Sequence, residues 1–127
     1  MVTALGYLGL AGFLWLAVFQ VALALGAPIG RMAWRGQYRV VPVRLRWASA
    51  ASALLVLAGA LTVAQAAWIG GAVLPEIMIR PLLWAFAALF ALSVVGNAMS
   101  DSRIERLHGV PVTLILVIAT GGLAILS

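Results

Sequence analysis

The chain has 127 residues, of which 65% are hydrophobic and only 9% are charged. Soluble domains usually carry about 25% charged residues, so the composition excludes a soluble domain and predicts an integral membrane protein. The formal net charge is +5, from eight arginines and three acidic residues, and the chain has no cysteine. These few arginines accompany long apolar stretches, so we expect no nucleic-acid partner. Disulfides and thiolate metal sites are excluded.

Four stretches are long and apolar enough to cross a bilayer, which takes roughly 20 residues in a helix. They cover about residues 5–26, 47–69, 82–100 and 110–126. The connections between them are short. We therefore expect an all-α fold in which residues 1–127 form a single transmembrane domain, an integral membrane four-helix bundle with short loops.

The arginines are distributed unevenly over the three connections. Only Arg80 lies in the second connection, whereas the first and third connections hold all the others. Under the positive-inside rule the arginine-rich connections face the cytoplasm, which leaves both termini extracytoplasmic. This distribution predicts a multi-pass protein of the bacterial cytoplasmic (inner) membrane. The seven arginines on the cytoplasmic side are Arg31, Arg35, Arg39, Arg44, Arg46, Arg103 and Arg106.

Small residues recur at helical spacing and predict close contacts between helices. In the first span they include Gly6, Gly9 and Gly12. Packing within one bundle is the simpler interpretation, and the alternative is a homodimer face. Val-Pro-Val also occurs twice, around Pro42 and Pro111, each time before an expected span. A degenerate repeat of two hairpins is one interpretation, and chance in so biased a composition is the simpler one.

Ionisable residues are missing from the predicted spans, where they would indicate a functional site. Glu76 lies in the second connection, and Asp101, Glu105 and His108 lie in the third. A proton relay, a membrane haem and a catalytic zinc site are therefore not expected, since each needs ionisable or ligating residues within the bundle. We expect no cofactor, no metal and no enzymatic activity.

Polar but uncharged side chains gather in the cytoplasmic half of the spans. An amide in hydrocarbon is costly unless it is paired, so these side chains should face the bundle interior. One interpretation is an interhelical hydrogen-bond clamp between the first and third spans. The other is a polar vestibule open to the cytoplasm, which admits water, an anion or a lipid headgroup. The residues of this set are Gln20, Ser49, Ser52, Ser93 and Asn97.

The first connection contains arginines at i, i+4 and i+8, namely Arg31, Arg35 and Arg39, with aromatic residues such as Trp34 beside them. If this segment is helical, the spacing predicts an arginine stripe with an aromatic edge in the headgroup region. Arg31, Trp34, Arg35 and Arg39 are then candidate contacts for anionic lipids or a ligand.

The acidic residues of the third connection offer another set of contacts. Asp101 and Glu105 are alternative partners for the arginines and would tie the two connections together. Ser102 and Glu105 also fit a capping box, which predicts a helical turn before the fourth span.

The first connection also carries a distinctive motif, GAPxGRxAWxGQ, over residues 26–37. It is followed by Pro42-x-Arg44-Leu45-Arg46 and, later, by Ser102-Arg103-x-Glu105-Arg106. Together these segments resemble an uncharacterised family of small bacterial four-span integral membrane proteins. The resemblance implies a fold and a membrane location, and it implies no activity.

The features together predict a non-enzymatic inner-membrane protein, either an accessory or packing subunit or a lipid-interacting module. Its expected partners are membrane lipids, with anionic headgroups at the cytoplasmic face, and a second copy or a larger membrane protein. The alternative is a small oligomeric channel or uniporter that passes an uncharged or anionic solute through the polar vestibule.

Overall fold

The structure is a computed structural model that describes all 127 residues, and four long helices account for most of them. They are α1 (Val2–Ala24), α2 (Val43–Ala66), α3 (Glu76–Ala98) and α4 (Arg103–Leu126). Each is long and apolar enough to cross a membrane. The predicted all-α four-helix bundle is confirmed, and the protein is a multi-pass membrane protein.

The helices begin earlier than the apolar stretches do. Helix α3 begins at Glu76 rather than near residue 82, and α4 begins at Arg103 rather than near residue 110. As a result, Pro111, which was expected to precede a span, lies inside α4, and Pro81 lies inside α3. Apolar length marks only the part of a helix that crosses hydrocarbon. The backbone can continue into the interface, and membrane helices tolerate internal proline.

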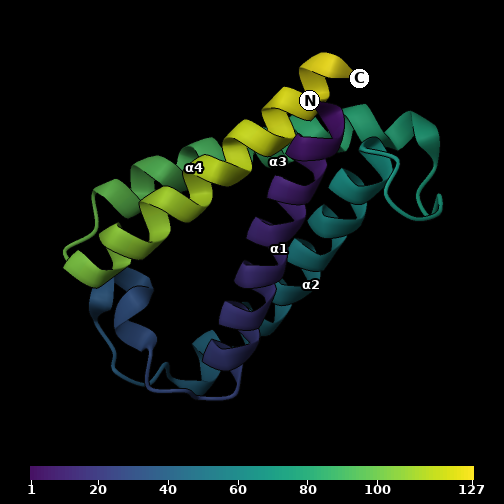
Figure 1. The fold of residues 1–127 in the computed structure, drawn as a ribbon. Helices are drawn as coiled ribbons and strands as arrows, with labels where there is room; N and C mark the ends of the chain where they lie inside the picture. The colour runs from purple at the N-terminus through teal and green to yellow at the C-terminus, as the bar shows by residue number, and fades with distance from the viewer.

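Two helical hairpins form a V, with α1 against α2 and α3 against α4 (Figure 1). The hairpins meet where the two chain termini lie side by side, and they diverge towards the opposite end (Figure 1). Residues 25–42 bridge the diverging ends and include two short 3₁₀ turns, η1 (Gly30–Met32) and η2 (Trp34–Gly36). Because this end carries seven of the eight arginines, we refer to it as the arginine-rich end.

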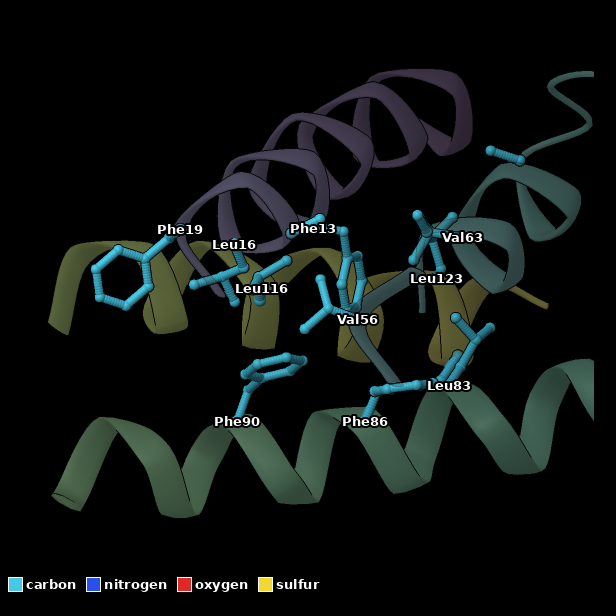
Figure 2. Packing of buried hydrophobic residues seen from close by; sticks show 14 of the residues in the cluster. Phe13, Leu16, Phe19, Val56, Val63, Leu83, Phe86, Phe90, Leu116 and Leu123 are labelled. Atoms are coloured by element: carbon cyan, nitrogen blue, oxygen red, sulfur yellow. The ribbon is translucent and has the colours of Figure 1, made fainter. Parts of the chain in front are cut away.

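A cluster of aromatic rings packs between the two hairpins, near the middle of α1 and α3. Phe13 of α1 lies edge-on to Phe86 and Phe90 of α3, with ring centroids 5.5 Å apart in both pairs. Leu116 of α4 is fully buried in the same cluster, as Figure 2 shows. Each such aromatic pair contributes about 0.5–1.5 kcal/mol beyond its buried area. This cluster forms a dense layer across the middle of the bundle.

Glycines allow the helices to approach closely. A Cβ at Gly59 of α2 would overlap the ring of Phe13, and one at Gly12 would lie 2.8 Å from Leu116 Cδ2. Gly9 similarly faces Val63 and Ala119 of the neighbouring helices. The small residues of α1 therefore serve packing within one chain, as the simpler interpretation of the sequence predicted.

The two Val-Pro-Val segments are not equivalent in the structure. Pro42 is the residue that precedes α2, whereas Pro111 lies inside α4. The hairpins thus do not share this feature, and the matches do not indicate a structural repeat.

Candidate functional site

The diverging hairpins enclose a cavity at the arginine-rich end of the molecule. Its volume is about 540 Å³, which lies within the usual range of roughly 300–1,000 Å³ for small-molecule sites. All four helices line it, and Met32–Arg35 of the bridging segment cover one side. Its polar lining consists of Gln20, Arg35, Ser52, Ser93, Asn97, Glu105, His108 and Thr113.

The structure brings together four of the five polar residues expected to form a vestibule. Gln20, Ser52, Ser93 and Asn97 all line the cavity. Ser49 does not: it is buried elsewhere, and its hydroxyl has no hydrogen-bond partner. The hydroxyls of Ser52 and Ser93 donate to backbone carbonyls four residues earlier, at 2.9 Å and 3.0 Å. Such bonds satisfy a hydroxyl within its own helix and leave its oxygen able to accept.

The two amides do not form the clamp that the sequence also allowed. No hydrogen bond joins Gln20 to Asn97. Asn97 instead packs over Gly109 of α4, where a Cβ would lie 2.5 Å from its Cγ. The amides are thus available to the cavity, and Gly109 is small because Asn97 occupies the adjacent space.

Glu105 lies in the first turn of α4 and lines the cavity. The helical turn predicted from the capping box is confirmed, but it is continuous with α4 rather than a separate turn in the connection, because the helix begins at the Ser102 cap, well before its apolar part. Ser102 Oγ accepts the backbone N–H of Glu105 at 3.3 Å, as the capping box predicted. The reciprocal bond is missing, because the Ser102 N–H donates to Ser100 Oγ at 3.1 Å.

The carboxylate of Glu105 is therefore free of the cap. The residue is only 8% exposed, and no hydrogen bond or ion pair involves its side chain; the one ion pair in the structure joins Arg35 to Asp101. The Ser49 hydroxyl is the one fully buried side-chain polar atom without a partner, so the unpaired carboxylate of Glu105 is accessible from the cavity that it lines. This residue is the unusual feature of the cavity.

His108 also belongs to α4 rather than to a loop, which corrects a second expectation. Its Nε2 accepts a hydrogen bond of 2.7 Å from the indole N–H of Trp15 on α1. The ring of Phe19 lies against the same imidazole, with centroids 4.7 Å apart. These contacts close the α1–α4 side of the cavity. Trp15 is half exposed at this contact.

Exposed leucines line the cavity on its other side, between α2 and α3. Leu55 of α2 and Leu89 of α3 line the cavity, yet they are 50% and 41% exposed. We refer to this exposed apolar edge of the cavity, at Leu55 and Leu89, as its mouth.

The bridging segment differs from the predicted arginine stripe. It forms two separate 3₁₀ turns, and Trp34 and Arg35 have positive φ angles of 50° and 58°. The i, i+4, i+8 spacing therefore does not place Arg31, Arg35 and Arg39 on one helical face. The segment cannot be one continuous right-handed helix, because Trp34 and Arg35 both take a left-handed backbone conformation.

The contacts between the first and third connections at the arginine-rich end agree in part with the prediction. Arg35 forms an ion pair with Asp101 at 3.2 Å and donates to Met99 O. Ser102 Oγ donates to Arg31 O at 2.6 Å. Glu105 forms no such pair. Arg31 and Arg39 are exposed and their guanidinium groups have no protein partner, so their contact with anionic lipids remains a prediction.

The cavity does not continue through the molecule. The packed layer of Phe13, Phe86 and Leu116 lies between it and a second cavity at the other end, which Gln65, Glu76 and Arg80 line among others. No group of three or more histidine, cysteine or acidic residues in the chain is placed to hold a metal ion.

Sequence reasoning missed two of the most informative lining residues, Glu105 and His108. The capping box at Ser102 was the available signal, because a helix that begins there carries both residues into the bundle. No family model, curated protein or solved structure matches the chain.

Proposed function

We propose that the protein is a non-enzymatic protein of the bacterial cytoplasmic membrane that holds the headgroup of a lipid or similar amphiphile in its cavity. The observation that carries this proposal is the mouth between Leu55 and Leu89. A headgroup inside would contact amides and hydroxyls, while its chain left through the mouth into the bilayer. A soluble ligand would gain nothing from an opening that faces lipid.

The side chains around the cavity favour binding rather than chemistry. A serine nucleophile needs an adjacent base, but the hydroxyls of Ser52 and Ser93 donate to the backbone and His108 Nε2 accepts from Trp15. The packed layer around Phe13 favours binding rather than passage of a solute across one copy of the chain.

The arginine distribution supports an orientation with the cavity on the cytoplasmic side. In this orientation both termini are extracytoplasmic. Arg31 and Arg39, exposed beside the cavity, would contact anionic headgroups of the inner leaflet, each worth about 1 kcal/mol. Membrane lipids are thus the principal partners that we propose.

A cavity-filling substitution tests the proposal. Ser93→Phe adds a phenyl ring to the cavity lining, whereas Leu92→Phe places the same ring on the lipid-facing side of α3, where Leu92 is 73% exposed. Native mass spectrometry of the purified proteins should find a bound amphiphile on the wild type and on Leu92→Phe. Ser93→Phe should lose it while it keeps its helical content. Equal retention by all three proteins would contradict the proposal.

A further inference from the structure

We infer that Glu105 makes the cavity a site for an ammonium group carried by an amphiphile. This inference rests on the proposed function and adds the charge of the ligand. The ammonium belongs either to an amine-bearing lipid headgroup or to a free lipophilic amine. Both offer a cationic nitrogen attached to an apolar chain.

The first argument is the missing partner of the carboxylate. Glu105 is 8% exposed as a residue, and its side chain, which lines the cavity, makes no hydrogen bond or ion pair with any protein group. In a full capping box the Glu105 carboxylate would accept the Ser102 N–H. Here Ser100 Oγ accepts that N–H instead. The carboxylate on the cavity wall forms no ion pair within the protein, and a cation in the cavity would supply the opposite charge.

The second argument is that the nearby cations are engaged elsewhere. The Arg35 guanidinium is held by Asp101 and the Met99 carbonyl. Arg106 donates to the Ser100 carbonyl at 2.6 Å. His108 acts as an acceptor towards Trp15 through Nε2. Of the two charged side chains that line the cavity, Arg35 is paired with Asp101 and Glu105 has no ion pair, so the unpaired charge on the cavity wall is negative.

The third argument is the aromatic lining around the same space. Trp34, Phe19 and Phe90 all line the cavity. Aromatic faces attract cations, and ammonium groups are often bound where a carboxylate and aromatic rings meet. The apolar mouth at Leu55 and Leu89 then accounts for the chain of the ligand.

The test compares headgroups on matched chains. Purified protein in a non-ionic detergent is titrated with phosphatidylethanolamine, phosphatidylglycerol, dodecylamine and dodecanol, and binding is followed by native mass spectrometry. The wild type should prefer each ammonium ligand to its matched counterpart. Glu105→Gln should weaken ammonium binding about tenfold, as loss of one charge-assisted hydrogen bond predicts, and should leave the other two ligands unchanged.

Glu76→Gln is the matched control, because Glu76 lies in the first turn of α3 and lines the cavity at the other end. It should bind all four ligands as the wild type does. Glu105→Asp keeps the charge and should retain part of the preference, which separates a charge effect from a folding defect.

The outcomes separate the two proposals. Amphiphile binding that Ser93→Phe abolishes but that shows no ammonium preference would overturn this inference and leave the proposed function in place. Absence of any cavity-dependent binding would overturn both. Preference for dodecylamine alone would assign the site to a free amine, and preference for the ethanolamine lipid alone would assign it to a headgroup.

Discussion

The guanidinium of Arg35 lies 3.2 Å from the carboxylate of Asp101, and this pair joins two connections that are far apart in the sequence. Arg35 belongs to the segment that covers the cavity, and Asp101 precedes Ser102, the residue that caps α4. The pair therefore links the cover of the cavity to the hairpin that carries Glu105.

The pair should contribute little to global stability, since its side chains are 51% and 79% exposed. Exposed ion pairs are worth about 0–1 kcal/mol and weaken with salt. We expect Asp101→Asn to lower the free energy of unfolding by less than about 1 kcal/mol at low salt, and by less still at high salt. Thermal unfolding in detergent measures both. A large loss that salt does not diminish would contradict this assignment.

Packing of Phe13 over Gly59 should be far more sensitive. The ring is fully buried and cannot move aside for a Cβ at Gly59. Overpacking of this kind costs about 1–3 kcal/mol, which exceeds the gain of up to about 1 kcal/mol for alanine over glycine in a helix. Gly59→Ala should therefore reduce stability, as measured by unfolding in detergent.

Gly121→Ala provides the control, because a Cβ there would lie 3.9 Å from Ala87 Cβ, an ordinary contact. It should be neutral or stabilising. If both substitutions had the same effect, the close approach of α1 and α2 would be wrong.

The hydrogen bond from Trp15 to His108 predicts a difference between two tryptophans of similar exposure. Trp15→Phe removes the donor to Nε2 and should cost about 1 kcal/mol. Trp84 is 47% exposed, close to the 49% of Trp15, and its indole makes no hydrogen bond with the protein. Trp84→Phe should thus leave the unfolding midpoint in detergent almost unchanged. Equal losses would show that the indole N–H of Trp15 has no special role.

Orientation can be tested with single cysteines, because the chain has none of its own. Gln37 lies in the bridging segment and Gly71 in the connection between α2 and α3, and both are exposed. In intact cells a membrane-impermeant maleimide should label Gly71→Cys and should label Gln37→Cys only after lysis. The opposite pattern would invert the topology and place the cavity on the outer side.

The four spans could be predicted because a bilayer imposes a minimum apolar length that this composition meets four times. The starts of α3 and α4 could not be predicted, since the apolar stretches begin only after Arg80 and His108, whereas the helices already begin at Glu76 and Arg103. That difference decides the site. It moves Glu105 from an expected loop to the wall of the cavity.

Of the five polar residues predicted to share one site, four line the cavity, and helix spacing alone could not identify the exception. Ser49 and Ser52 lie three residues apart on α2, yet only Ser52 lines the cavity. The divergence of the two hairpins decides between them, and no local pattern encodes it. The predicted arginine stripe in the bridging segment was wrong for a related reason. Residue spacing alone cannot reveal that Trp34 and Arg35 take positive φ angles.

The most direct test of the account is to locate a lipid on the protein. Vesicles are prepared from the wild-type protein and a lipid with a photoreactive diazirine in its headgroup. After the vesicles are irradiated, the lipid adducts on the protein are mapped by peptide mass spectrometry. We predict adducts on cavity-lining residues such as Gln20, Ser52 and Ser93, and their loss in Ser93→Phe. Adducts confined to exposed interfacial residues outside the cavity, and unchanged in that variant, would contradict the central claim.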